Sequence, residues 1–135
     1  MDTVDKATRS RYMSAVKSRG NRSTEMKMVR LLRKNKLKGW RRHKRITGTP
    51  DFCWPVIKVA LFVDGCFWHG CPRCYNLPKS NVIFWKNKVI GNRRHDKRVN
   101  LILRAQGWKV LRVWGCRINE KRTLLRLRTA LHSQN

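Results

Sequence analysis

Acidic residues are scarce in this sequence. Its 135 residues include only seven Asp and Glu against 33 Lys and Arg, which gives a formal net charge of +26 at pH 7. A surface of one sign repels itself unless a polyanion neutralises it, and nucleic acid is the polyanion that basic proteins most commonly meet in a cell. The charge balance therefore predicts a nucleic-acid-binding protein.

Long apolar runs are also absent. The chain contains no stretch of about 18 apolar residues, the length that could span a bilayer. No strongly amphipathic basic helix dominates the chain either, so a membrane partner is not expected. The opening residues, MDTVDKATRS, lack the apolar segment of a secretory signal peptide. We therefore expect a cytoplasmic protein.

Repeats, low-complexity tracts and linkers rich in Pro, Gly or Ser are missing too, which predicts one domain over residues 1–135. Helices are predicted for residues 5–17, 24–37, 80–105 with Ser80 as the cap, and after Asn119. Strands are predicted for residues 41–46, 51–54, 56–63 and 108–114. The nearly continuous apolar run of residues 56–63 is typical of a central strand covered on both faces. This order favours an α/β fold with a mixed sheet flanked by helices.

Five cysteines are present, and in a reducing compartment clustered thiols bind metal more often than they form disulfides. Cys66, Cys71 and Cys74 share one loop, and Cys116 lies just past the last predicted strand. These four thiolates could complete a tetrahedral Zn2+ shell if the strands at 56–63 and 108–114 are parallel neighbours. Two alternatives stay open: unrelated thiols packed as small apolar groups, or His69 replacing one cysteine ligand. The isolated Cys53 is predicted to be a core residue.

The few acids can be considered one at a time. Asp51 begins a predicted strand and Asp64 ends one, and carboxylates at strand ends suit Mg2+ in a phosphodiester hydrolase, although Asp is also common in turns. Glu25 lies on the same helix face as the apolar Met28, which points it inward; stabilisation of the first helical turn is the competing explanation.

Two further residues could take part in catalysis. Asp96 stands among basic residues, where a surface ion pair is the simpler explanation. His69 follows Asp64 by five residues, close enough to a cation at the strand end to act as a general acid or base.

Aromatic residues occur among the cations of the cysteine loop. Phe67, Trp68 and Trp85 could insert between base pairs while nearby Lys and Arg contact phosphates. Large aromatics also fill cores, and Trp108 and Trp114 are predicted to do so. Because adjacent Phe67 and Trp68 cannot easily point into one core, at least one is expected to face the ligand.

These motifs together resemble the very short patch repair (Vsr) DNA mismatch endonuclease family over nearly the whole chain. The block Phe62–Pro72, FVDGCFWHGCP, is the most specific match. The others are Asp5–Ser10, Glu25, Pro50–Phe52, Pro78–Asn81, Phe84–Trp85, Asn92–Asp96 and Gly107–Trp114.

The resemblance implies a fold like that of type II restriction endonucleases, with a zinc-bound loop. It also implies Mg2+-dependent, strand-specific nicking 5′ of the thymine in T:G mismatches, which arise by deamination of 5-methylcytosine. The expected partners are double-stranded DNA with a T:G mismatch and, functionally, a cytosine-5 DNA methyltransferase. We expect a monomer that associates with a bacterial-type nucleoid.

The resemblance also implies roles for individual residues. Asp51 would bind Mg2+, His69 would assist attack by water, and Glu25 and Asp96 would support the metal and water network. Phe67, Trp68 and Trp85 would form the wedge beside the mismatch. The four cysteines would hold structural Zn2+, and the basic helix within residues 1–20, with Lys6, Arg9 and Arg11, would clamp the duplex.

The chain departs from the family pattern at two points. Gly115 replaces a glutamate of many members, and the zinc ligands are all cysteines where some members use histidines. The alternative function is a non-catalytic zinc-dependent DNA-binding module, which would share the charge and the zinc ligands. It would give no reason for Glu25, Asp51, His69 and Asp96 to occur together in so acid-poor a chain.

Overall fold

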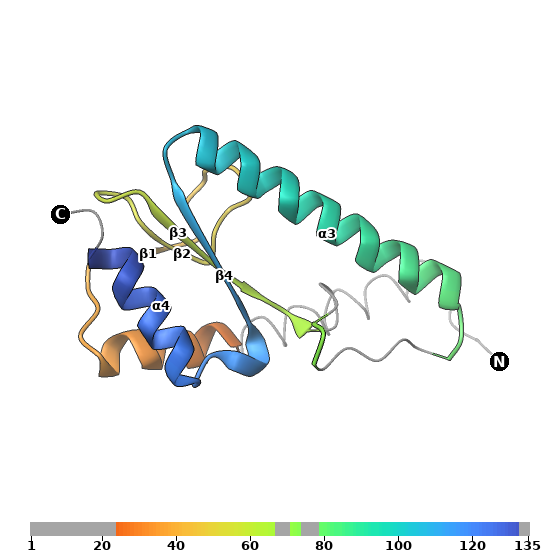
Figure 1. Cartoon of the computed structure of the whole chain (residues 1–135), viewed down its shortest axis with the longest axis horizontal. Coiled ribbons are helices and arrows are strands. Elements are labelled where there is room, and N and C mark those ends of the chain that lie inside the picture. The colour runs from red at the N-terminus through yellow and green to blue at the C-terminus, as the bar shows by residue number, and fades with distance from the viewer. Residues whose placement is uncertain (1–23, 67–70, 74–78, 133–135) are drawn as a thin grey trace.

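A computed structural model describes residues 24–66, 71–73 and 79–132 of the chain. Its four strands form one mixed sheet in the order β1-β2-β3-β4 (Figure 1). They are β1 (Arg41–Arg42), β2 (Phe52–Trp54), β3 (Val59–Asp64) and β4 (Lys109–Trp114). β1, β2 and β3 pair antiparallel in turn, whereas β3 and β4 are parallel, from Val59 beside Lys109 to Asp64 beside Trp114. The predicted α/β class with a mixed sheet is confirmed.

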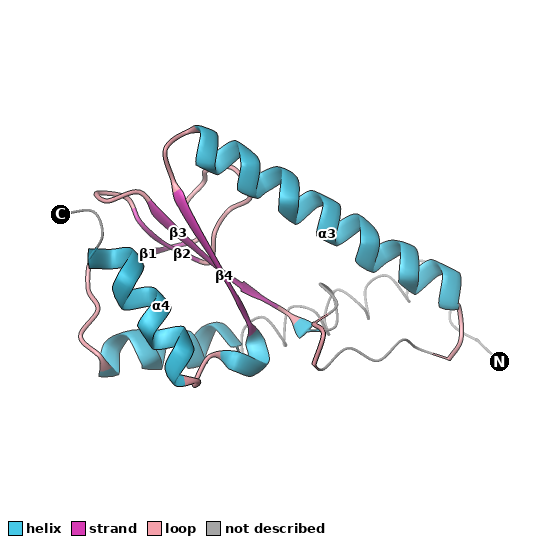
Figure 2. Cartoon of the chain, viewed as in Figure 1, coloured by secondary structure: helices cyan, strands magenta, loops and turns pink. Residues whose placement is uncertain are grey.

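Helices lie on both faces of this sheet (Figure 2). The helix at residues 24–34 and α4 (Lys121–His132) cover one face, and the long α3 (Val82–Ala105) runs along the other. A short 3-10 helix, η1 (Gly115–Arg117), connects β4 to the segment before α4. Among the described residues, none of the helices combines the length and the apolar character needed to cross a membrane.

Strand β3 is the centre of the core because its two faces are both apolar. Alternate residues of a strand point to opposite faces. One face of β3, with Val59, Leu61 and Val63, therefore packs against the helix at residues 24–34 and α4. This cluster includes Met28, Leu32 and Leu127. Ala60 and Phe62 pack against α3, in a second cluster with Val99 and Leu103. The predicted covering of both faces is confirmed, as is the complete burial of Cys53.

Some predicted boundaries are wrong. Residues 55–58 form the turn of the β2–β3 hairpin, so the apolar run enters the sheet only at Val59. β1 ends at Arg42, four residues before the predicted end of this strand. The predicted Ser80 cap is not observed: α3 begins after Asn81, whose side chain makes no capping hydrogen bond. The predicted helix at residues 5–17, with Lys6, Arg9 and Arg11, lies outside the described residues.

The connection from β1 to β2 packs tightly against the α3 side of the sheet. Gly48 has a φ of +75°, and a Cβ at this position would collide with the side chain of Val99. Pro50 is fully buried at the end of this connection. Since Asp51 follows directly, the packing of Gly48 fixes where that carboxylate enters the sheet.

We expect Gly48→Ala to lower the free energy of unfolding by about 1–3 kcal/mol, because it adds both backbone strain and overpacking. Urea denaturation followed by tryptophan fluorescence measures the change. Gly91→Ala is the matched control, since Gly91 is exposed in α3 with nothing within 4 Å of the added Cβ. It should raise stability by roughly 0.5–1 kcal/mol. Equal stability of Gly48→Ala and the wild type would contradict this account of the connection.

Candidate active site

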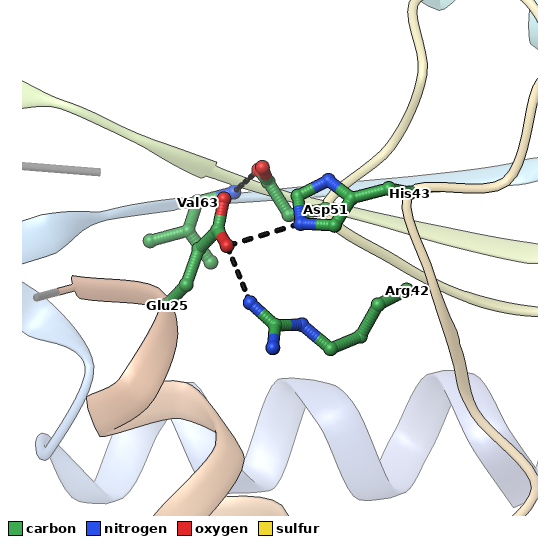
Figure 3. Close-up of polar contacts among 5 residues, drawn as sticks. All are labelled: Glu25, Arg42, His43, Asp51 and Val63. Atoms are coloured by element: carbon green, nitrogen blue, oxygen red, sulfur yellow. Dashed lines mark hydrogen bonds and ion pairs between the residues drawn. The ribbon is translucent and has the colours of Figure 1, made fainter. Parts of the chain in front are cut away.

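Glu25, His43 and Asp51 converge from three separate segments (Figure 3). Glu25 lies in the first turn of the helix at residues 24–34. β1 and β2 pair with Arg42 opposite Phe52, and continuing this register places His43 opposite Asp51. The His43 N–H donates to the Asp51 carbonyl at 3.4 Å, which holds the two segments together. One ligand atom from each of the three side chains lies within 4.8 Å of the others.

The two carboxylates are held in different ways. Glu25 is buried, and its Oε2 accepts from Arg42 Nη2 at 2.6 Å and contacts His43 Nε2 at 3.1 Å. Asp51 Oδ2 accepts from the backbone N–H of Val63 on β3 at 2.7 Å. The predicted inward direction of Glu25 is therefore confirmed, and a rigid central strand fixes Asp51.

The environment of Asp51 opposes a negative charge. Burial, the largest cause, together with the adjacent Glu25 carboxyl and the charge of Asp64, raises the pKa of Asp51 from 3.8 to about 7, against the hydrogen bond from Val63, which lowers it. Two carboxylates this close resist simultaneous ionisation, and a divalent cation between them would remove that conflict. Carboxylate oxygens from two sides suit a hard cation such as Mg2+. The residues present therefore fit a catalytic divalent ion.

Asp64 and Asp96 meet around Arg112 on β4. Arg112 Nη1 lies 2.9 Å from Asp64 Oδ1 and 3.5 Å from Asp96 Oδ1. Its Nε donates to Asn100 Oδ1 at 2.7 Å, and its guanidinium lies 4.1 Å from the centroid of the Phe62 ring. Asp96 is thus joined to the sheet through Arg112. Asp64 acts on Asp51 through its charge, and its role as a direct Mg2+ ligand remains a prediction.

Three of the predicted zinc ligands come together at the carboxyl edge of the sheet. Cys66 follows β3 and Cys116 lies in η1 after β4, so the parallel pairing brings both to one edge. Cys71 is buried between them, with its N–H bonded to the Cys66 carbonyl at 2.9 Å. The sulfurs of Cys71 and Cys116 lie 3.7 Å apart, and Cys66 completes a group of three possible metal ligands.

The remaining predicted site residues are distributed unevenly. His69, Phe67, Trp68 and Cys74 lie outside the described residues. Trp85 is half-buried in the first turn of α3, in edge-to-face contact with Phe84 at a centroid distance of 4.9 Å.

Three residues of these clusters, Arg42, His43 and Arg112, were not predicted from the sequence. The scarcity of histidine, with only four in the chain, was the one available indication for His43.

Comparison with known proteins identifies the family. The model of the family "DNA mismatch endonuclease Vsr" matches residues 1–76. The chain belongs to the Vsr family. It is 41% identical over 128 residues to the type II nicking enzyme V.XorIIP of Xanthomonas oryzae pv. oryzae, covering 91% of this chain and 92% of that protein. It is 34% identical over 125 residues to the DNA mismatch endonuclease Vsr of Escherichia coli K12, covering 91% and 79%. The prediction of a nuclease of this family is confirmed.

Gly115, one of the two expected departures from the family pattern, has an explanation in packing. A Cβ at this position would lie 2.7 Å from Thr24 Cγ2. Thr24 precedes Glu25, so the absence of a side chain at residue 115 lets η1 approach the start of the helix that carries Glu25. A larger residue here would require Thr24 to move.

We predict an unusual pH dependence of stability for the Mg2+-free protein. Because the pKa of Asp51 is raised in the fold from 3.8 to about 7, the folded state binds more protons than the unfolded chain between these values. The contribution of Asp51 to stability is therefore most favourable below about pH 4 and falls as the pH rises toward 7. Asp51→Asn keeps an acceptor for the Val63 N–H but removes the charge. With zinc bound and no Mg2+ added, this variant should unfold at a higher urea concentration than the wild type near pH 8.

The difference in stability between Asp51→Asn and the wild type should become smaller as the pH falls from 7 toward 5. Each unit of the pKa shift corresponds to about 1.4 kcal/mol of this difference. Glu120→Gln is the control with the same charge change. Arg73 Nη1 donates to Glu120 Oε1 at 2.5 Å and lowers the pKa of Glu120, so this variant should gain nothing near pH 8. An Asp51→Asn protein less stable than the wild type near pH 8 would contradict the prediction.

Proposed function

We propose that this chain is a Mg2+-dependent endonuclease that nicks one strand of duplex DNA 5′ of the thymine in T:G mismatches and so initiates very short patch repair. The observation that carries the proposal is the meeting of the buried Glu25 and the partly buried Asp51 in a chain with only seven acids. The names of the Vsr-family relatives support nicking and mismatch recognition. A non-catalytic DNA-binding module would have no use for this pair.

The proposed chemistry divides between the cation and the protein. A Mg2+ ion held by Asp51 and Glu25 would neutralise phosphate charge and lower the pKa of its bound water. Val63 fixes Asp51, while Arg42 and His43 fix Glu25, so that both carboxylates are in position before DNA arrives. His69 is proposed to take the proton of the attacking water. Asp64 is proposed as a further Mg2+ ligand and Asp96 as support for the metal and water network, and Arg112 contacts both carboxylates.

A structural Zn2+ is proposed at Cys66, Cys71, Cys74 and Cys116. In a tetrahedral shell with Zn–S bonds of about 2.3 Å, two sulfurs lie about 3.8 Å apart. The 3.7 Å between the sulfurs of Cys71 and Cys116 fits this spacing. Four thiolates leave no position for water, so the role is structural rather than catalytic. The ion would tie the segment after β3 to the end of β4.

The DNA contacts are proposed from charge and aromatic placement. The wedge would comprise Phe67, Trp68 and Trp85, and the N-terminal basic segment with Lys6, Arg9 and Arg11 would clamp the backbone. One nick needs one active site, which favours a monomer. The mismatch arises where 5-methylcytosine deaminates, which supports a functional link to a cytosine-5 DNA methyltransferase and a place on the bacterial nucleoid in the cytoplasm.

We predict that Asp51→Asn lowers the single-turnover rate of nicking a T:G duplex by roughly a thousandfold or more, because several kcal/mol of charge stabilisation is lost. Affinity for the duplex should be unchanged or higher, since a negative charge facing phosphate is removed. The assay compares a T:G duplex with a T:A duplex, with and without Mg2+, at one stated salt concentration.

Glu120→Gln again serves as the control, because it changes the net charge equally at an exposed residue. It should nick at the wild-type rate. A near wild-type rate for Asp51→Asn at ordinary Mg2+ would exclude the proposed site, and nicking at the same rate with no divalent cation added would exclude the proposed chemistry.

Zinc occupancy gives a separate prediction. The protein should carry one Zn2+, and Cys116→Ser should lose or weakly retain it, with a lower unfolding temperature, because a structural zinc contributes directly to folding. Elemental analysis and thermal unfolding measure both effects. Cys53→Ser is the matched control: it changes a buried thiol whose pKa is raised by burial and which belongs to no cysteine cluster of the described chain. Full zinc retention in Cys116→Ser would remove this residue from the proposed shell.

A further inference from the structure

His43 stands at the candidate active site without any role assigned above beyond contact with Glu25. Its ring is positioned by the backbone, because the residue has a φ of +51°, a left-handed conformation that is uncommon for residues other than Gly and in which Asn, Asp and His are enriched. The backbone N–H of His43 donates a hydrogen bond to the Asp51 carbonyl at 3.4 Å. Its Nε2 lies 3.1 Å from Glu25 Oε2, and the side chain is 49% exposed. The ring is therefore aimed at the carboxylates rather than buried for packing.

We propose that His43 is a third cation ligand and that it gives the site a preference for a first-row divalent transition ion over Mg2+. The inference rests on the proposed function, because it assumes a cation bound by Glu25 and Asp51. What it adds is a nitrogen donor and the choice of ion that follows from it.

The chemistry of the donor set supports this assignment. Mg2+ favours oxygen ligands in near-ideal octahedral geometry and keeps several waters, so an imidazole contributes little to its binding. First-row transition ions accept imidazole readily, with affinity rising from Mn2+ toward Cu2+. Glu25, Asp51 and His43 supply two carboxylates and one imidazole within 4.8 Å. A site with this mixture binds a transition ion more tightly than a site with the two carboxylates alone.

Arg42 provides the alternative explanation of the same geometry. Its Nη2 lies 2.6 Å from Glu25 Oε2, the oxygen that His43 also contacts. Arg42 and His43 could therefore together balance the charge of Glu25, and the imidazole would then not coordinate the cation. In that arrangement His43 orients Glu25 and has no effect on which ion binds. Direct detection of nitrogen on the bound ion separates the two explanations.

The test uses the full zinc-loaded chain without DNA and Mn2+ as the probe, which is the most stringent choice because Mn2+ is the weakest binder of the series. Free Mn2+ is measured by its electron paramagnetic resonance signal, and pulsed measurements detect nitrogen bonded to the bound ion. The main variant is His43→Asn, since Asn tolerates a positive φ and keeps the local backbone. His132→Ala, at the exposed end of α4, is the control for loss of a histidine.

We expect His43→Asn to weaken Mn2+ binding by about 10–100-fold, the usual effect of removing a residue that supports a metal site. The nitrogen signal should be lost in this variant and kept in His132→Ala. Mg2+ affinity, measured by competition against Mn2+, should change by less than about threefold, because Mg2+ relies on oxygen ligands. His43→Ala should behave like His43→Asn, which shows that the effect comes from the missing imidazole.

Asp51→Asn distinguishes failure of this inference from failure of the proposed function. If Asp51→Asn loses Mn2+ while His43→Asn keeps both the affinity and the nitrogen signal, the carboxylate site stands and His43 is not a ligand. If the wild type binds Mn2+ no better than Asp51→Asn, both the ligand role of His43 and the proposed cation site are wrong. Equal loss of Mg2+ and Mn2+ affinity in His43→Asn would overturn the selectivity and leave His43 as a positioning residue for Glu25.

Discussion

The parallel pairing of β3 with β4 is the interaction on which the rest of the structure depends. It aligns six residue pairs, from Val59 beside Lys109 to Asp64 beside Trp114, and ends both strands at one edge of the sheet. That edge carries Cys66 and the segment with Cys116, so the sulfurs meet without any direct sequence connection. The same register sets Phe62 beside Arg112, whose guanidinium stacks on the ring and reaches Asp64 and Asp96. A slip of one residue would separate both clusters.

Charge economy explains how a chain of +26 can build such clusters. In the part of the chain that the structure describes, every acidic side chain contacts a partner within the fold. Glu25 contacts Arg42 and His43, Asp64 and Asp96 share Arg112, Glu120 meets Arg73, and Asp51 accepts the Val63 N–H. With 33 Lys and Arg against seven acids, the cations far outnumber the acids that could pair with them, which suits binding to phosphate. Because opposite charges are so few, each acid acts at a particular point rather than in general neutralisation of the surface.

The sequence predicted those features that depend on local pattern or on the chemistry of single residues. A nearly continuous apolar run located β3, the long helical stretch ending near Ala105 located α3, and the rarity of acids pointed to Glu25 and Asp51. His43 was not predicted, because the expected strands at 41–46 and 51–54 are joined by a short turn that would place residue 46 opposite Asp51. In the observed register His43 lies opposite Asp51, and the longer connection that follows packs Gly48 against Val99. Arg112 was missed for a related reason: its partners lie on β3 and α3, and only the assembled sheet brings them together. Long-range register cannot be read from one strand's pattern.

The β2–β3 hairpin has a practical consequence for handling the enzyme. Its turn at residues 55–58 joins the end of β2 to the start of β3. Asp51 precedes β2 and Cys66 follows β3, so both lie at the opposite end of the hairpin from the turn. Val56 in this turn is 96% exposed. Exposed turn tips tolerate insertion and chemical attachment better than any other part of a domain. A fluorophore or a surface anchor attached at Val56 would therefore report on, or immobilise, the protein while leaving the face that carries Glu25, His43 and Asp51 open to a long duplex.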